Sequence, residues 1–413
     1  MASGLPRRDR ASCDYEAYLP DFLVGRSVRL DGDVAADVTD AEAAIARFDA
    51  KAAVLADTET LARLLLRAES VASSRIEGLE VGGRRLLRAE AAQSLGEAAH
   101  DVTAVEVLGN IQAMSWALNA VGPGDDVTLE TLLEAHRRLL AGTHLEEMGG
   151  HIREKQNWIG GSNFNPCSAA FVPPPPEYVD DLLEDLWGFS NADSLPAVAQ
   201  AALAHAQFET IHPFVDGNGR IGRALIHLVL RRRGLAVRAL LPISVVLATS
   251  STDYITGLTT TRYRGSPTSR VACDGLNHWI SLFAAASRRA VGDAEVFENE
   301  VSDLQAQWRA QLGAVRRGSA VDLLINALPG APIVTATGAA QVINRSFQAA
   351  NEAISRLVEA RILKQVNVGR RNRAFEAADV IRRFTQLERR LASPTGNTRS
   401  SEPSRRVPRR SAR

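Results

Sequence analysis

The sequence predicts a mainly α-helical protein, and three patterns support that prediction. Apolar residues recur at three- and four-residue spacing through residues 40–142. A second helical stretch covers 195–230 and is interrupted by a short, polar, glycine-rich segment. Alternation typical of strands is confined to short segments near 150–161 and 363–376. We therefore expect a helical core with a small β-hairpin, followed by a C-terminal unit of helices and a second hairpin.

Length and composition exclude several classes of protein. The 413 residues suffice for two or three domains, and a hydrophobic content of 45% suits packed cores. Lys+Arg and Asp+Glu are equal at 48 each, so bulk charge does not favour nucleic acid. No signal peptide is recognised near Met1, and the apolar run 236–248 contains Arg238 and Pro242. We expect a cytoplasmic protein without membrane spans.

The three cysteines are scattered and odd in number, which argues against a disulfide framework. Three reduced thiols are expected at Cys13, Cys167 and Cys273.

The N-terminal third is expected to be helical after about forty irregular residues. One helix begins near Asp40 and a second at Thr58. Shorter helices are expected over 86–95 and 100–120, and Thr128 is expected to cap another. His136, on that last helix, is expected to be a packed or surface residue and not a metal ligand.

The most informative stretch is 211–223, IHPFVDGNGRIGR, which follows an Ala-rich helix over 195–210. Gly217 and Gly219 let backbone N–H groups approach an anion closely. The helix expected to begin near Asn218 adds free N–H donors and the positive end of its dipole. This arrangement predicts a phosphate site.

Charged side chains in the same stretch extend this prediction. Arg220 and Arg223 lie three residues apart, so both face one side of the helix. Asp216 is an oxygen ligand of the kind that holds Mg²⁺ beside phosphates. His212 can accept a proton near neutral pH. The set indicates a nucleotide polyphosphate site with a general base.

Alternative interpretations of this stretch fit less well. Residues 217–222 match the dinucleotide pattern G-x-G-x-x-G, but a helix precedes them and no acid lies near 238–241. A Walker A loop is absent from the sequence. An ordinary polar helix cap would not need two glycines, a histidine and two arginines together.

The run HPFVDGNGRIGR resembles, position for position, the motif HPFxDGNGRxxR of Fic-domain proteins. In that family the usual reaction moves AMP from ATP to a hydroxyl side chain of a target protein. The resemblance implies that His212 is the catalytic base and that Asp216 binds Mg²⁺. It also implies a nucleotide-binding set made of Gly217, Asn218, Gly219, Arg220, Ile221, Gly222 and Arg223.

The resemblance also implies a role for a second segment of the chain. Ser73, Glu77 and Gly78 match the family's inhibitory motif [S/T]xxxE[G/N], although alone they would indicate only a helix end. The resemblance implies that Glu77 pairs with Arg223 and takes the place of the γ-phosphate. We therefore expect an autoinhibited enzyme.

The segment 149–176 interrupts the helical pattern. Two short strands, 150–153 and 156–161, are expected to form the hairpin with which Fic proteins dock the target's backbone. The tract 171–176, FVPPPP, is expected to be a rigid connector. His205 and His212 lack the spacing of a zinc site, so transition-metal catalysis is not expected.

After the motif, Tyr254 is equally consistent with a core position and with a place near the adenine. A long helix is expected over 282–312. A helix over 320–328, a second that opens with 335–340, a third over 346–360 and a hairpin over 363–376 then predict a winged helix-turn-helix domain. Such units often end bacterial Fic proteins.

The C-terminal unit carries basic residues that could contact DNA phosphates: Arg345, Arg356, Arg370, Arg371 and Arg373. Glu352 and Glu359 lie on the same expected helix, and no base-reading set stands out, so a protein-contact role is favoured over DNA binding. The last residues, 393–413, are expected to form a disordered basic tail.

The predicted organisation has five parts: an N-terminal helical region with the inhibitory motif (1–98), a Fic catalytic domain (99–290), a linking helix (291–317), the winged helix (318–388) and the tail (389–413). Three alternative functions stay open, namely removal of AMP, phosphate transfer, and DNA-binding regulation with a nucleotide sensor. ATP, Mg²⁺ and a target protein, which can be the chain itself, are the expected partners, and a homodimer is conceivable.

Overall fold

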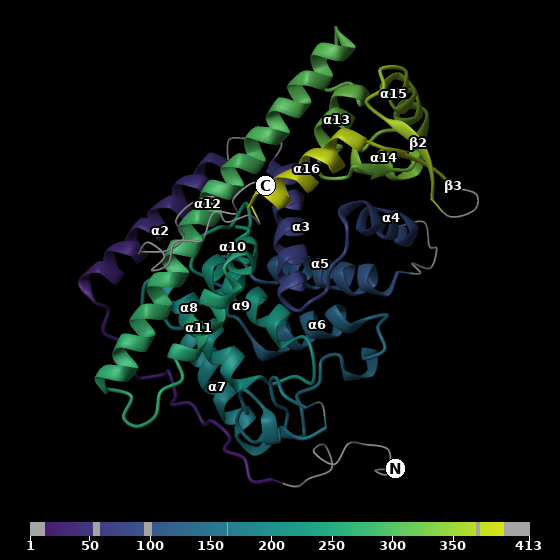
Figure 1. The fold of residues 1–413 in the computed structure, drawn as a ribbon. Coiled ribbons are helices and arrows are strands. Elements are labelled where there is room, and N and C mark those ends of the chain that lie inside the picture. Colours follow the sequence, from purple (N-terminus) through teal and green to yellow (C-terminus); the bar gives the residue numbers. More distant parts are fainter. Residues whose placement is uncertain (1–12, 53–57, 95–100, 163, 369–371, 392–413) are drawn as a thin grey trace, which may run out of the picture.

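The structure is a computed structural model that describes residues 13–52, 58–94, 101–162, 164–368 and 372–391. Within these residues the chain is mainly helical, as expected, and has one small antiparallel sheet (Figure 1). The helices are α2 (Gly32–Ala52), α3 (Thr58–Ile76), α4 (Gly83–Ser94), α5 (Val102–Ala120), α6 (Leu129–Leu140), α7 (Val179–Ser190), α8 (Ala197–Ile211), α9 (Asn218–Arg232), α10 (Ile243–Thr249), α11 (Ser251–Thr260), α12 (Arg270–Leu312), α13 (Ala320–Ala327), α14 (Ala336–Val342), α15 (Phe347–Glu359) and α16 (Ala378–Leu391). The strands are β1 (Ile333–Val334), β2 (Lys364–Val368) and β3 (Asn372–Glu376).

Helix α8 is the centre of the fold. All fifteen of its residues are buried, and the helix contacts α7, α9 and α12. Its many alanines let neighbouring helices approach closely on every side, and a helix covered all round needs no polar face. Because α8 leads directly into 211–223, the glycine-rich stretch begins from a completely buried helix.

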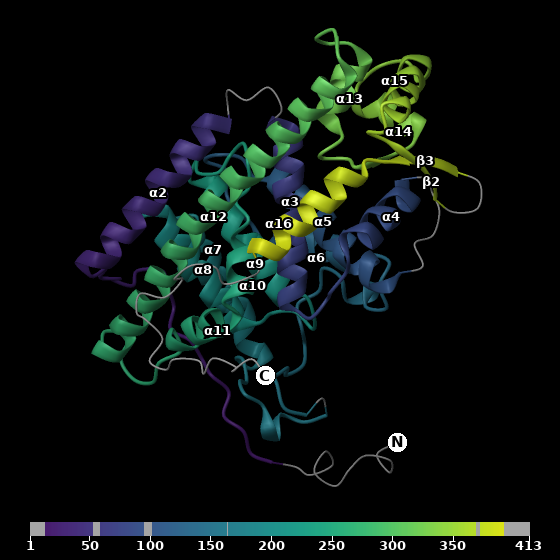
Figure 2. The same cartoon turned by 45° about the horizontal axis from the view of Figure 1, so that its top comes forward.

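Two groups of helices enclose this centre. Helix α2 lies along the long helix α12 in both views (Figures 1 and 2). Helix α3 packs against α5 and α10 on the other side. Helix α12 begins at Arg270, not near residue 282 as expected, because Ser269 caps it by accepting a hydrogen bond from the N–H of Ala272. Within the part of the chain that the structure describes, no helix is both long and apolar enough to cross a membrane.

The segment 149–176 differs from the expected hairpin. In its described residues, strand pairing is limited to one antiparallel bridge between Ile159 and Phe171. Gly160 and Gly161 both have positive φ, 72° and 77°, so the chain turns away immediately after the bridge. Arg153, expected in the first strand, directs its guanidinium to backbone carbonyls of other segments. The segment is a loop held by side chains.

The prediction of three reduced cysteines is wrong. Cys13 and Cys167 form a disulfide that joins the N-terminal segment to the 149–176 loop, whereas Cys273 is free. The two residues are 154 positions apart, so their proximity is a property of the tertiary structure. Disulfides persist mainly in oxidising compartments, so this bond is not what a cytoplasmic location leads one to expect.

The C-terminal unit has the expected order of three helices and a β2–β3 hairpin. The short strand β1, which the sequence did not indicate, pairs with β3 and gives the sheet order β1-β3-β2. Helix α16 then returns to lie between α12 and α3 (Figure 2), where Phe384 stacks on Phe297 with ring centroids 5.7 Å apart. The expected contacts of Arg370 and Arg371 and the tail beyond 391 lie outside the described residues.

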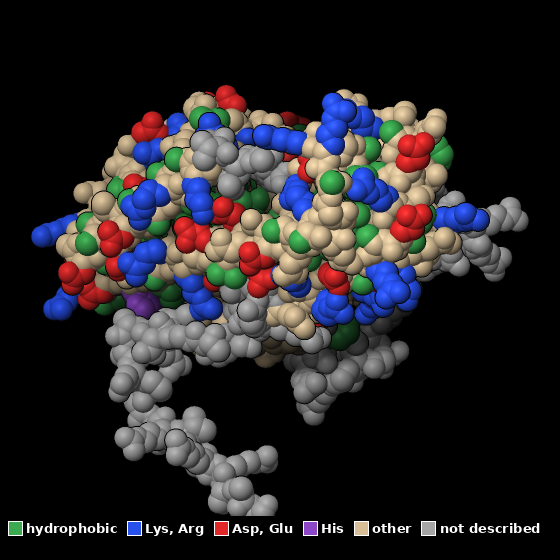
Figure 3. All heavy atoms as spheres, turned by 90° about the horizontal axis from the view of Figure 1, so that it is seen from above, with side chains coloured by type: hydrophobic (Ala, Val, Ile, Leu, Met, Phe, Trp, Pro, Cys, Tyr) green, Lys and Arg blue, Asp and Glu red, His purple; other side chains and the backbone are tan. Residues whose placement is uncertain are grey.

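Basic and acidic side chains are interspersed on the face that Figure 3 shows, which includes the C-terminal unit. This mixture agrees with the equal totals of the two kinds of charge in the sequence.

Candidate active site

The site begins where α8 ends. His212 is the C-cap of α8 and adopts left-handed backbone angles, φ 51° and ψ 59°, which are uncommon for residues other than glycine. The guanidinium of Arg153 supports this conformation by donating to the carbonyls of His212 (2.9 Å) and Ile211 (3.3 Å). Arg153 is 4% exposed, so these bonds lie out of water. The turn therefore places His212 at a fixed position.

The loop that follows is closed by amide side chains. Asn218 accepts from the N–H of Phe214 and donates to its carbonyl, both at 2.8 Å. Asn157 donates to the carbonyls of His212 and Phe214. Asn218, which the family resemblance assigned to nucleotide binding, thus uses its side chain to hold the loop.

His136 holds the same loop from α6. Its Nδ1 accepts from the N–H of Gly150, so Nε2 carries the hydrogen and donates to the carbonyl of Asp216 at 3.0 Å. The ring stacks on Phe214 with centroids 3.8 Å apart and is fully buried. Burial lowers the pKa of His136 to about 4, so the ring is neutral. The expectation of a packed histidine is confirmed.

An anion-binding helix end lies next to this loop. Helix α9 begins at Asn218, as the sequence indicated, and Gly217 before it has a φ of 79°. The first N–H groups of a helix have no partner within it, so they are available to an anion. Arg220 is 4% exposed and donates to Asp216 at 2.8 Å. A cation, a carboxylate and free N–H donors therefore meet at one place.

The carboxylate of Asp216 has the properties of a magnesium ligand. Its side chain is 49% exposed, so it can reach a hydrated ion. Mg²⁺ bound with a nucleotide keeps several waters and needs only one or two protein carboxylates. The donor set therefore fits Mg²⁺ that arrives with phosphates, and among the described residues no cluster of three or more His, Cys, Asp or Glu forms a separate metal site.

The segment predicted to be inhibitory meets this helix end. Arg223 is 1% exposed, and its guanidinium donates to Oγ and the carbonyl of Ser73, each at 2.8 Å. It also donates to Glu77 Oε1 at 2.6 Å. A Cβ atom placed on Gly219 would lie 1.9 Å from the same carboxylate oxygen. The Glu77 carboxylate therefore occupies the space directly over the first turn of α9.

Helix α3 is held in this position by buried bonds. Glu69 pairs with His227 at 2.9 Å and accepts from the N–H of Ser244 at 2.7 Å. Residues 69 and 73 of α3 and residue 77 in the turn just after it are four apart, as 223 and 227 are on α9, so these contacts lie on one side of each helix. Gly78 ends α3 with a φ of 80°, in agreement with its expected role at a helix C-terminus.

Two members of the predicted nucleotide-binding set face inward. Ile221 is 1% exposed and belongs to the core. A Cβ on Gly222 would lie 2.6 Å from Glu209 Oε1 and 3.3 Å from His205 Nδ1. The absence of a side chain at Gly222 thus makes room for buried polar groups of α8. Tyr254 donates to or accepts from His205 at 2.8 Å and is 3% exposed, which supports its core position.

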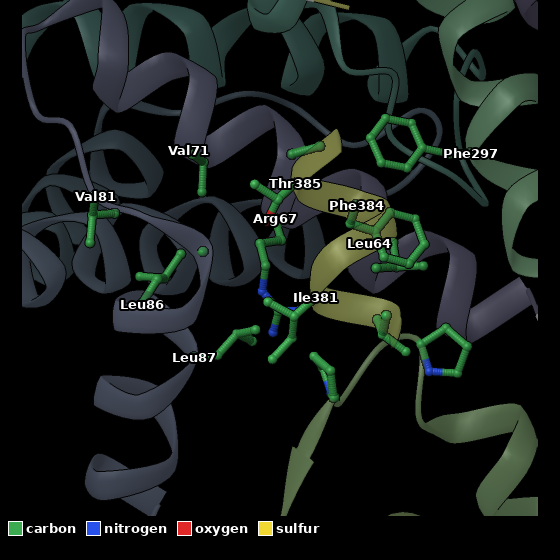
Figure 4. A pocket seen from close by; sticks show the side chains of 15 residues that line it. Leu64, Arg67, Val71, Val81, Leu86, Leu87, Phe297, Ile381, Phe384 and Thr385 are labelled. Atoms are coloured by element: carbon green, nitrogen blue, oxygen red, sulfur yellow. The ribbon is translucent and has the colours of Figure 1, made fainter. Parts of the chain in front are cut away.

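A cavity elsewhere in the fold is not the nucleotide site. It lies between α3, α4 and α16, has a volume of about 50 Å³, and is lined by residues that include Leu64, Arg67, Leu86 and Phe384 (Figure 4). Benzene fills a cavity of about 150 Å³, so this one is too small for a nucleotide. None of its lining residues belongs to 211–223.

Sequence reasoning missed the residues that position the site. Arg153 and Asn157 were assigned to the two expected strands, and His136 received no role in the site. Their partners are backbone atoms of 211–216, and no local spacing reveals such contacts. Nothing in the residues around Arg153 indicates that its side chain is buried. The motif 212–223, in contrast, can be recognised from the sequence itself.

The comparison with solved structures identifies the fold. A "Fic family protein" from Desulfovibrio desulfuricans superposes with a TM-score of 0.52 at 20% identity, covering 87% of this chain and 98% of that one. At 20% sequence identity, this structural similarity is evidence for the fold alone. The chain therefore has the Fic fold.

The sequence comparisons match two parts of the chain to one family. The model described as "Fic/DOC family" matches residues 126–230, and "Fic/DOC family N-terminal" matches 35–119. These two parts of the chain are similar to the Fic/DOC family. Relatives include "Protein adenylyltransferase fic-1" of Caenorhabditis elegans, 35% identical over 27% of this chain and 20% of that protein. "Protein adenylyltransferase Fic" of Culex quinquefasciatus is 38% identical over 31% and 25%. The chain thus spans a fifth to a quarter of the relatives it matches.

Proposed function

We propose that the protein is an adenylyltransferase that moves AMP from ATP to a Ser, Thr or Tyr hydroxyl of a target protein. The observation that carries this proposal is the complete motif 212–223, folded as a base next to an anion-binding helix end with two buried arginines. The names of the matching relatives support the same reaction.

The chemistry follows from the placement of His212. Burial lowers its pKa to about 4, so the ring is neutral at pH 7 and can accept a proton. The target hydroxyl gives its proton to the imidazole while its oxygen forms a bond to the α-phosphorus of ATP. The bond from that phosphorus to the α–β bridging oxygen breaks, and pyrophosphate leaves. Arg220 and Arg223 stabilise the charge on the phosphates.

Asp216 is the residue that would hold Mg²⁺. The ion would neutralise charge on the phosphates when bound. Arg220, which donates to Asp216, orients the carboxylate. Both groups lie in the first turn of α9 or just before it, so they act on the same phosphates.

We further propose that Glu77 inhibits the reaction. Its carboxylate bonds Arg223 and lies within van der Waals reach of Gly219, where an anion would approach the helix end. Two negative groups cannot share that place without strong repulsion. ATP therefore binds poorly, or without correct placement of its α-phosphate, until Glu77 moves.

Three proteins test the activity: wild type, Glu77→Gly and His212→Ala in the Glu77→Gly background. Each is incubated with Mg²⁺, a cell lysate and ATP labelled at the α-phosphate. We expect label on protein with Glu77→Gly, little with wild type and none with the double variant. A parallel reaction with γ-labelled ATP is the control, because label from that nucleotide alone would establish phosphate transfer and reject the proposal.

A further inference from the structure

One buried acid of the central helix has no role in the reaction described above. Glu209 lies on the last turn of α8, and its side chain is 10% exposed. No hydrogen-bond partner is found for its Oε1 among the described residues. Other polar side chains of the helix do have partners: Gln200, Gln207 and Thr210 each bond a backbone carbonyl. Burial of a carboxylate with an unpaired oxygen costs free energy of folding, so the presence of Glu209 at this position needs an explanation.

The neighbour of Glu209 is the base. Its Oε2 lies 4.0 Å from Nδ1 of His212. That Nδ1 is buried, and no hydrogen bond of ordinary geometry is found for it among the described residues, although the backbone of Glu209 interacts with the ring and raises the pKa of His212. The histidine side chain as a whole is 19% exposed. The accessible part of the ring is therefore not the Nδ1 edge, so a substrate meets the other edge. The carboxylate thus lies behind the reacting edge, with Oε2 toward Nδ1 and the unpaired Oε1 toward Gly222.

The surrounding residues hold the carboxylate in place. Gly222 of α9 leaves the space in which Oε1 lies, since any Cβ there would be 2.6 Å from it. Phe208 and His205 line the same space. A Glu209 side chain that is enclosed in this way has few rotamers, and it stays beside His212.

We propose that Glu209 is a positioning residue for His212: its carboxylate orients the imidazole and stabilises the positive charge that the ring gains from the target hydroxyl. This inference rests on the proposed function. The proton moves from the hydroxyl to the exposed ring edge, and Nδ1–H then faces the carboxylate. Glu209 touches neither nucleotide nor target and acts only through His212.

The charges around Glu209 set the pH at which it can act. The pKa of Glu209 is raised to about 7: burial is the main cause, Arg223 of α9 opposes it, Glu77 after α3 adds to it, and Arg262 after α11 opposes it. His205, whose pKa burial lowers to about 3, and the buried Tyr254 are neutral neighbours. Only the ionised carboxylate can stabilise an imidazolium. Its contribution to the rate therefore appears as the pH rises through about 7 and disappears below that.

The kinetic test compares Glu77→Gly with Glu77→Gly/Glu209→Gln from pH 5.5 to 9. Glutamine keeps the size of the side chain and removes its charge. At high pH we expect kcat to fall at least about tenfold with KM for ATP unchanged within about twofold. The two proteins should converge in kcat at low pH, where Glu209 is protonated. Glu209→Asp should restore part of the loss, and Gln207→Leu, on the same buried helix, should not change kcat.

A second measurement does not depend on AMP transfer. Imidazole ¹⁵N shifts of His212 are followed by NMR through a pH titration without ATP. As Glu209 ionises, the Nδ1–H tautomer of the neutral His212 ring should gain population; Glu209→Gln should remove this pH dependence, and Gln207→Leu should keep it. A tautomer ratio that does not change as Glu209 ionises, or a kcat ratio that is the same at every pH, would overturn the inference. A protein that transfers no AMP but shows the NMR change would reject the proposed function alone.

Discussion

Removal of the charge of Glu77 should strengthen ATP binding, and the size of the effect can be worked from the structure. Glu77 Oε1 lies 2.6 Å from the Arg223 guanidinium, which is 1% exposed. Two unit charges 4 Å apart interact by about 4 kcal/mol at an effective dielectric constant of 20. The Glu77 side chain is 37% exposed, so solvent reduces the repulsion of a γ-phosphate to about 1–3 kcal/mol. We expect Glu77→Gln to lower the Kd of ATP roughly tenfold to hundredfold.

Isothermal titration calorimetry with Mg²⁺ and a non-hydrolysable ATP analogue measures this change without turnover. Glu80→Gln is the matched control, because Glu80 is exposed, lies three residues further along and makes no contact with Arg223 in the described structure. The affinity gain of Glu77→Gln should shrink at high salt, since screening weakens the same repulsion. A Kd within twofold of wild type, or an equal gain in Glu80→Gln, would refute the reasoning that the carboxylate competes with phosphate.

Four further outcomes follow from the geometry. In the Glu77→Gly background, Gly219→Ala should weaken ATP binding at least about tenfold by calorimetry, because a methyl group there fills the anion's place. Arg153→Ala should lower the free energy of unfolding in urea by about 3 kcal/mol, since buried carbonyls lose a charged donor. The folded-state pKa of His136 lies below its ordinary value, so the neutral ring contributes its full stabilisation above about pH 6.5. That contribution is lost as the pH falls toward about 4. His136→Gln should therefore make the free energy of unfolding depend less on pH between these two values. Maleimide labelling of unfolded, unreduced protein should modify one thiol, Cys273, and after reduction all three.

Local chemistry made much of the protein predictable. The helices over 58–76 and 218–232 begin where the sequence placed them, because glycines and apolar spacing act within a few residues. Gly78 has the positive φ expected of a residue that ends a helix. The contact of Glu77 with Arg223, inferred from two family motifs, is present across 146 residues.

The loop 149–176 shows where local patterns are insufficient. Its alternation favours two strands, but a strand forms only when a partner accepts its hydrogen bonds. Arg153 and Asn157 instead bond carbonyls of the motif loop, so the backbone is held by side chains and a single bridge remains. The Cys13–Cys167 bond was likewise missed, because sequence spacing does not show which distant thiols meet.

The sequence by itself determined the chemical groups of the site: a histidine, a carboxylate, two arginines and a glycine-rich turn at the start of a helix. Only the tertiary structure decided their environment. Burial of Glu209 against α9, partial burial of His212, and closure of the anion site by Glu77 come from the packing of α3, α8 and α9. Desolvation and charge proximity depend on distances between segments far apart in the chain, whereas donor type and helix polarity depend on neighbours along it.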